Sequence, residues 1–289
     1  MPQQLSTPVI LRLLLTVGCC GSFSACDDSE KRFVIASNEG VEALHRQDYA
    51  GAEQAFKQAS ALRPRDGETH YYLGVAAVRD PERLAIGIKH FQDALAVDPA
   101  FPEAWIALAR AQYEAKQVVP ARTSLNKLFE LDPGHPNGHL LRAKIALTSN
   151  QKVLADEELR AALAGDGTFV PAYSMLARLY TDVGGYDAAR LVLEEGLRLV
   201  PDATELQELI GVAWLDLGRP DRAKMALDDA TAKPRVAKSA YLNLANACLQ
   251  LGEKPAAIQA LKTFLAQSMG QKNDPSVLAA LKTLQRLQK

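Results

Sequence analysis

Two histidines near the middle of the chain have a spacing that could hold a metal ion. His135 and His139 are four positions apart, and side chains at that spacing share one face of a helix. Pro136 and Gly138 lie between them and disfavour a regular helix. His139 also occupies a position of a repeated pattern, described below, where other units carry a large packing side chain. We therefore interpret this pair as packing residues and expect no metal site.

Sequence patterns of catalytic sites do not occur in the chain. The 289 residues contain no Walker loop, dinucleotide fingerprint, HExxH motif or nucleophile elbow. The 33 Lys and Arg residues nearly balance the 34 Asp and Glu residues, whereas nucleic-acid binding requires a basic excess or patch. We expect no enzyme activity, no cofactor and no nucleic-acid partner.

Cys26 has the clearest candidate chemistry, the attachment of a lipid. An uncharged run of apolar and small residues follows Arg12 and extends to residue 25. This run is too short to span a bilayer but suits the apolar region of a secretory signal. Residues 22–26 resemble the bacterial lipobox, although Phe23 stands where leucine is usual. The resemblance implies that a signal peptide of residues 1–25 is removed and that Cys26 is lipidated.

Other interpretations of this leader stay open. Cys19 is a second lipobox-like candidate, but it leaves only six residues after Arg12 for the apolar region. An ordinary secretory signal cut near Ser24, or an uncleaved anchor, is also compatible with the composition. We expect residues 26–32 to form an acidic tether. The lipid would anchor the protein in the cell envelope facing the periplasm, and Asp27 does not decide between the inner and outer membranes.

A helical pattern repeats every 33 to 35 residues along the rest of the chain. Most units close on a proline, at positions 64, 99, 133, 201 and 234. A repeat of this length with helical periodicity predicts stacked helix pairs. Small residues would let the two helices of a pair approach closely, while bulky residues would fill the layer between units. The third unit shows the full pattern, with Trp105, Leu108, Ala109, Ala121, Leu125, Leu128 and Pro133.

These units resemble the tetratricopeptide repeat, and the resemblance covers about residues 33–268. It implies an all-α fold, an α-solenoid wound as a right-handed superhelix from about seven helix-turn-helix units. The expected units are approximately 33–66, 67–101, 102–135, 136–169, 170–203, 204–237 and 238–268. A C-terminal capping helix is expected over 275–289. Its apolar face would comprise Val277, Leu278, Leu281, Leu284 and Leu287.

The resemblance also implies a concave groove lined by the first helix of each pair. Arg110, Lys144 and Arg178 occupy the same groove-facing position in three consecutive units. We expect them to form a cationic ladder suited to an acidic protein segment or a C-terminal carboxylate. The alternative is that Arg110 pairs with Glu114, and Arg178 with Asp182, on the surface of a single helix.

Three further residues are candidates for contact with a partner. Tyr113 would add an apolar surface beside the cations. Asn243 and Asn246 match a fragment of the carboxylate clamp of chaperone-binding family members, whose complete set of residues no combination of units supplies. Binding of a chaperone tail is therefore not expected.

Together these features predict a non-enzymatic scaffold or assembly factor for proteins of the bacterial cell envelope, held to a membrane by its lipid. A soluble periplasmic regulatory subunit without lipid is the alternative. A pilotin-like factor for pilus or secretin assembly is a more specific version of the first hypothesis. The partner, the pathway and the oligomeric state are left open.

Overall fold

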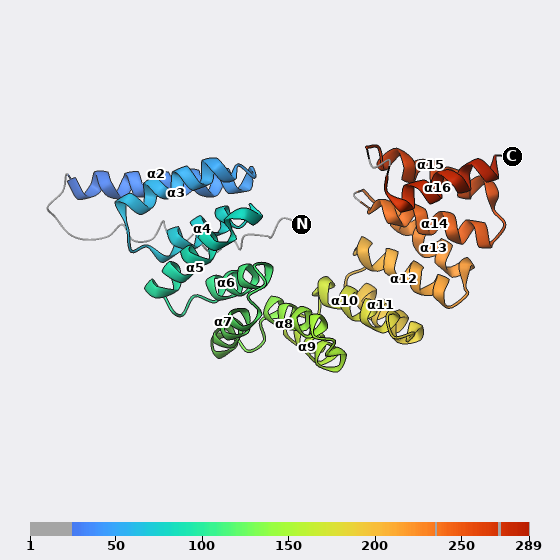
Figure 1. Ribbon diagram of the computed structural model, residues 1–289, viewed down its shortest axis with the longest axis horizontal. Helices are drawn as coiled ribbons and strands as arrows, with labels where there is room; N and C mark the ends of the chain where they lie inside the picture. Colours follow the sequence, from blue (N-terminus) through green and yellow to red (C-terminus); the bar gives the residue numbers. More distant parts are fainter. Residues whose placement is uncertain (1–24, 235, 271–272, 289) are drawn as a thin grey trace. The chain divides into compact units, whose positions relative to one another are not determined.

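The computed structural model describes residues 25–234, 236–270 and 273–288, and every regular element in these ranges is helical. The chain divides into two compact units, residues 1–133 and 134–289, each of which is considered by itself (Figure 1). The first unit contains α2 (Ala25–His45), α3 (Tyr49–Leu62), α4 (Gly67–Ala77), the short 3-10 helix η1 (Pro81–Arg83), α5 (Leu84–Val97), α6 (Pro102–Glu114) and α7 (Val118–Leu131). The second contains α8 (Pro136–Thr148), α9 (Lys152–Gly165), α10 (Val170–Thr181), α11 (Tyr186–Leu199), α12 (Thr204–Asp216), α13 (Pro220–Thr231), α14 (Lys238–Gln250), α15 (Lys254–Gln267) and α16 (Pro275–Leu287).

The helices pack in consecutive pairs, as the repeat pattern predicts. Helix α2 packs on α3, α4 on α5 and α6 on α7, and the pairing continues in the second unit from α8 with α9 to α14 with α15. We call the first helix of each pair the A helix and the second the B helix. Each B helix from α3 to α5 and from α9 to α13 also contacts the A helix of the next pair. The expected all-α repeat fold is confirmed.

A small residue on the A helix lies against a large side chain on the B helix in each pair. A Cβ atom built on Gly40 would lie 2.6 Å from the Phe56 ring, and one on Gly74 would lie 2.5 Å from the Phe91 ring. A Cβ atom built on Gly211 would likewise lie 2.5 Å from Leu227 Cγ. In the remaining pairs alanine takes the glycine position and leucine the large position, all of them buried: Ala109 with Leu125, Ala143 with Leu159, Ala177 with Leu193, and Ala245 with Leu261.

In six of the seven described helix pairs, the turn between the A and B helices contains one residue with a left-handed backbone. Glycine fills this position at Gly184, Gly218 and Gly252, with φ of 76°, 68° and 76°, because it has no Cβ to clash. In three other pairs a non-glycine residue adopts the same conformation: Gln47, Lys116 and Asn150, with φ of 61°, 62° and 55°. After each of these six residues, the next N–H donates to a carbonyl five residues back, which closes the A helix as a Schellman motif.

Helix α2 begins before the first repeat was expected to start. Residues 28–32, part of the expected tether, lie within α2 and are exposed. The arginine of the next helix explains this extension, because Arg63 pairs with Glu30 and its guanidinium lies 4.2 Å from the centre of the Phe33 ring. These residues of the expected tether are thus helical, and their role as a tether stays a prediction. The expected signal peptide up to residue 24, and the side chain of Cys26, lie outside what the structure describes.

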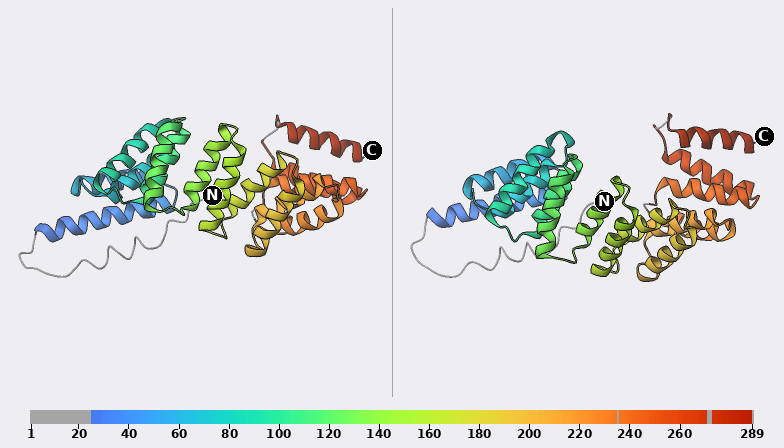
Figure 2. Two further views of the ribbon diagram at one scale, coloured as in Figure 1. Left: turned by 90° about the horizontal axis from the view of Figure 1, so that it is seen from below. Right: turned by 60° about the horizontal axis from the view of Figure 1, so that its bottom comes forward.

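The last helix covers the final pair of the second unit. Helix α16 lies against α15 (Figure 2). Val277 and Ala280 of α16 are buried, and Leu284 and Leu287 pack against the same apolar cluster as α15. Leu278 and Leu281 were expected on the buried face, but they are 54% and 41% exposed. The buried residues follow helical spacing from Val277, and Leu278 is turned about 100° away from that stripe. Among the described helices, none has the length and apolar content needed to cross a membrane.

The close contact between Gly74 and Phe91 gives a stability prediction. Alanine is normally better than glycine in a helix by about 1 kcal/mol, but a methyl group at Gly74 would lie 2.5 Å from the Phe91 ring. We expect Gly74→Ala to lower the free energy of unfolding by about 1–3 kcal/mol, the usual cost of overpacking. Thermal unfolding followed by circular dichroism measures the change.

The matched control restores the pairing that four other helix pairs use. Phe91→Leu alone should destabilise the protein because it leaves a cavity. In the Gly74→Ala/Phe91→Leu double variant, alanine faces leucine as Ala143 faces Leu159. The double variant should be more stable than the sum of the two single effects by about 1–2 kcal/mol. Additive effects, or a stabilising Gly74→Ala, would contradict this account of the contact.

Candidate interaction surface on the A helices

Several neighbouring A helices contact one another within each unit. Helix α2 contacts α4 in the first unit, and in the second unit α10 contacts α12 and α12 contacts α14. The B helices make their main contacts with A helices. We call the surface of successive A helices that bears Val41, Val75 and Arg110 in the first unit, and Lys144, Arg178 and Asn246 in the second, the A-helix face.

The A-helix face of the first unit is mainly apolar and aromatic. Val41 and Val75 are partly buried and pack on the cluster that contains Phe56 and Leu73. Tyr71 lies 5.1 Å from the Phe101 ring, centre to centre, and burial raises its pKa to about 12. Tyr113, a predicted contact residue, is half-buried in α6. This face offers an aromatic surface for a partner.

Arg110 is half-buried in this apolar environment. Burial lowers the pKa of its guanidinium, while the nearby carboxylate of Glu114 and the ring of Tyr71 act in the opposite direction. The sequence alternative of an interaction with Glu114 therefore has electrostatic support.

In the second unit the cations are more exposed. Lys144 on α8 is exposed, and the Arg178 side chain on α10 is 64% exposed. Arg178 Nη2 lies 3.7 Å from Glu205 Oε1 on α12, so its ion pair reaches the next repeat and not Asp182 of its own helix. An acidic partner segment would compete with Glu205 for Arg178.

The two predicted asparagines lie on α14 in different surroundings. Asn243 is half-buried, and its Nδ2 is 3.5 Å from Glu208 Oε1 on α12. Asn246 is exposed, and its Oδ1 accepts a 3.3 Å hydrogen bond from Gln250. Amide and carboxylate groups thus connect α12 to α14 on this face.

The structure places only part of the predicted ladder in one body. Lys144 and Arg178 belong to the second compact unit, and Arg110 belongs to the first. The alignment of all three in a single groove stays a prediction. Glu205 and Glu208 were not predicted as part of this surface. Their repeat positions, the second and fifth of the A helix, were the signal that could have identified them.

The two histidines with metal-ligand spacing have separate partners. His135 precedes α8, and its Nδ1 accepts a 3.1 Å hydrogen bond from the backbone N–H of Gly138. His139 Nδ1 lies 2.7 Å from Glu158 Oε2, and Arg142 donates a 3.2 Å hydrogen bond to the other oxygen of Glu158. One histidine caps a helix and the other joins α8 to α9, so the two do not converge on a metal position.

The A-helix face can therefore hydrogen-bond, pair charges and pack against aromatic rings. These are the contacts of a surface that binds an extended polypeptide segment. The fold and this surface define a helical-repeat interaction protein.

Comparison with family models assigns the family. Models of the tetratricopeptide repeat match residues 83–145 in one case, and residues 38–82, 174–223 and 215–272 in the other. The chain belongs to the tetratricopeptide repeat family. Repeats of this family are protein–protein interaction modules and are typically non-catalytic.

Relatives of established name share the repeat region. Cellulose synthase 1 operon protein C of Komagataeibacter xylinus is 26% identical over 250 residues, which are 80% of this chain but only 18% of the relative. Type IV pilus assembly protein PilF of Pseudomonas aeruginosa is 28% identical over 189 residues, which are 62% of this chain and 71% of that protein. Among solved structures, a tetratricopeptide repeat protein from Parabacteroides merdae has 18% sequence identity and a TM-score of 0.61, and the match covers 90% of this chain and 100% of that one. At that identity the structural likeness shows the fold alone.

The different burial of the two arginines predicts different effects on stability. Arg110→Glu should lower the melting temperature by several degrees, because it places a new carboxylate beside Glu114 in a half-buried position. Arg178→Glu should change it by little, because exposed ion pairs contribute only about 0–1 kcal/mol. Thermal unfolding of the two purified variants gives the comparison. Arg110→Met, which keeps the apolar stem, is the control, and equal effects of the two Glu variants would contradict the assignment.

Proposed function

We propose that this protein is a non-enzymatic scaffold or assembly factor of the bacterial cell envelope. It binds an extended segment of a partner protein on its A-helix face. The observation that carries the proposal is that different residues of each repeat hold the fold together and face the solvent. Buried alanine and leucine residues hold the helix pairs together, so the exposed charged and amide side chains of the A helices are available for recognition.

The relatives support an assembly function. PilF, by its name, takes part in type IV pilus assembly, and the match covers most of its length. The K. xylinus protein belongs by name to a cellulose synthase operon. Because the two systems differ, they support a scaffold and do not select the partner. A pilotin-like factor for pilus or secretin assembly is the candidate favoured by the PilF match.

The leader supports a location in the envelope. The apolar run and the lipobox-like sequence ending at Cys26 are typical of bacterial lipoproteins, whose acyl chains hold the protein at a membrane surface. A soluble periplasmic regulatory subunit is the alternative, and it would need neither Cys26 nor a lipid.

The A-helix face can be tested by site-specific photo-crosslinking in intact cells. A photoreactive residue at Lys144 or Arg178 should crosslink to the same segment of one partner, identified by mass spectrometry. The same residue at Met225 is the control, since Met225 is 71% exposed but lies on B helix α13 of the same compact unit. Equal capture from Met225 would refute the assignment of the A-helix face.

A charge reversal tests whether the cation contributes to this binding. With the photoreactive residue at Lys144, Arg178→Glu should reduce capture of the partner at least severalfold, because the new carboxylate repels an acidic segment. Lys262→Glu, on B helix α15 of the same unit, removes an exposed cation elsewhere and should leave capture unchanged. Equal capture by Arg178→Glu and the parent would exclude an acidic segment at this position.

Lipidation can be tested separately. Cys26→Ala should abolish incorporation of radiolabelled palmitate and move the protein from the membrane fraction to the soluble periplasmic fraction. Cys19→Ala should leave both unchanged. Loss of labelling only in Cys19→Ala would reassign the lipid to that residue. Membrane association that persists in Cys26→Ala would refute the anchor while leaving the A-helix face untouched.

A further inference from the structure

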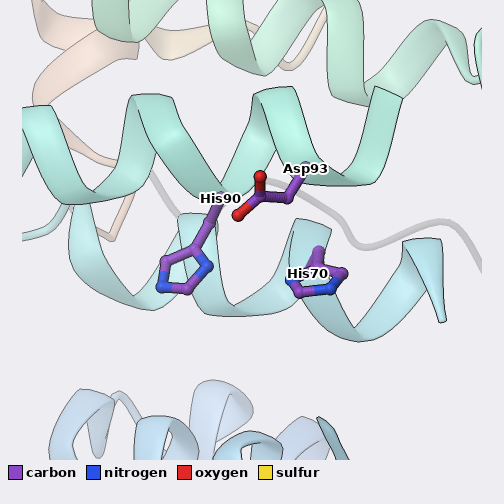
Figure 3. Close-up of side chains that lie close together, drawn as sticks. All are labelled: His70, His90 and Asp93. Atoms are coloured by element: carbon purple, nitrogen blue, oxygen red, sulfur yellow. The ribbon is translucent and has the colours of Figure 1, made fainter. Parts of the chain in front are cut away.

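We infer that His70, His90 and Asp93 form a binding site for a divalent transition metal ion, zinc being the ion that the site suits best. His70 lies on α4, and His90 and Asp93 lie one turn apart on α5. Figure 3 shows the three side chains close together, with His90 and Asp93 on α5 and His70 on α4. One ligand atom of each residue lies within 4.8 Å of the other two.

The His70 ring is held in the tautomer that a metal ligand needs. His70 Nε2 lies 3.0 Å from the carbonyl oxygen of Pro64. A carbonyl oxygen only accepts hydrogen bonds, so Nε2 carries the proton and Nδ1 presents a lone pair. Donation of the other ring N–H to a backbone carbonyl is the usual support of a metal-ligating histidine.

This hydrogen bond is a recurrent feature of the repeat. At the equivalent positions of other pairs, Trp105 donates to Pro99 O at 2.8 Å and Gln207 to Pro201 O at 2.9 Å. Tyr173 does the same toward Gly167 O at 3.1 Å. The packing of the repeat therefore accounts for His70 Nε2, but it leaves Nδ1 unexplained.

Both histidines have a buried nitrogen without a protein partner. The Nδ1 atoms of His70 and His90 are buried and make no hydrogen bond within the described residues. A buried polar atom without a partner costs about 1–3 kcal/mol. A metal ion coordinated by these two nitrogens would supply the missing partner.

The nearby carboxylate of Glu53 is committed to other partners. Arg83 donates two hydrogen bonds to it at 2.7 and 2.8 Å, and Lys57 Nζ lies at 2.8 Å. These contacts, the Arg83 bonds foremost, hold the pKa of Glu53 at about 2. The protein therefore supplies three ligands, and the fourth position of a tetrahedral ion remains for water or another ligand.

The donor set selects the class of metal. Two imidazoles and one carboxylate suit zinc and other borderline divalent ions, whereas magnesium and calcium prefer oxygen ligands alone. Zinc imposes no geometry of its own, and its ligands at about 2.0–2.1 Å would lie roughly 3.3 Å apart. The three side chains must therefore draw together, which side-chain rotation on two packed helices can supply. A bound ion would clamp α4 to α5.

The test measures zinc binding by the full-length chain without a histidine tag. Cys19, Cys20 and Cys26 are replaced by serine in every protein, because thiolates bind zinc strongly. Competition with a chromophoric zinc chelator should give one zinc per chain. His90→Gln and Asp93→Asn should each raise the Kd for zinc about tenfold or more, at least the effect of losing a supporting group. His45→Gln, at an exposed position on α2, should not.

Thermal unfolding provides an independent readout. Saturating zinc should raise the melting temperature of the parent and of His45→Gln, because an ion that binds only the folded state stabilises it. The increase should disappear in His90→Gln and Asp93→Asn, and magnesium should have no effect on any of the proteins. Asparagine has nearly the same shape as aspartate. The Asp93→Asn variant therefore still tests the site if replacement of a histidine disturbs the packing. Binding below one zinc per chain, or a Kd in the Asp93→Asn and His90→Gln variants equal to that of His45→Gln, would overturn the site.

Discussion

In each helix pair, one small residue of the A helix lies directly against one large side chain of the B helix, and the other contacts of the repeat depend on this close approach. Glycine faces phenylalanine in the first two pairs, where a Cβ would lie 2.5–2.6 Å from the ring. Alanine faces leucine in four later pairs. The summed side-chain volume of glycine with phenylalanine is similar to that of alanine with leucine, so both pairs of residues keep the interior closely packed. Gly211 faces Leu227, so glycine on the A helix is also compatible with leucine on the B helix.

Much of this arrangement is readable from the sequence because it is local and repeated. The small and the large residue are 16 positions apart in six pairs and 17 apart in the second, so periodicity alone locates most helix pairs. The second pair contains one additional residue before α5, and the chain accommodates it in η1, with Asp80 accepting a hydrogen bond from the N–H of Glu82. The small residues of the pattern predicted the close contact between the two helices of a pair correctly.

Other features depend on contacts that spacing does not specify. Gln47, Lys116 and Asn150 adopt the left-handed turn conformation without being glycine, because the Schellman hydrogen bonds of the surrounding helix ends require it. Arg178 pairs with Glu205 of the next repeat, although Asp182 is nearer in sequence. The cluster at His70 joins two helices, and its only local signal is the spacing of His90 and Asp93 by one helical turn. The early start of α2 has a similar origin, because Arg63 contacts Glu30 and the Phe33 ring, and the repeat spacing does not specify these contacts.

The contact between the small and the large residue of each pair also explains why single repeats can carry features of their own. A helix pair is held by its buried small and large residues, so its remaining positions can differ without loss of the fold. The equivalent of His70 is Trp105 in one pair and Tyr173 in another, and all three direct a polar atom to the carbonyl six residues earlier. Histidine makes that hydrogen bond with one ring nitrogen and still has a second nitrogen that can bind a metal. Tryptophan and tyrosine have only one polar side-chain atom, and the hydrogen bond uses it. A substitution that preserves the packing contact of the repeat thus supplies a potential metal ligand between two helices. By the same reasoning, the A-helix face of each unit can acquire its own chemistry, aromatic in the first and charged in the second, on one common scaffold.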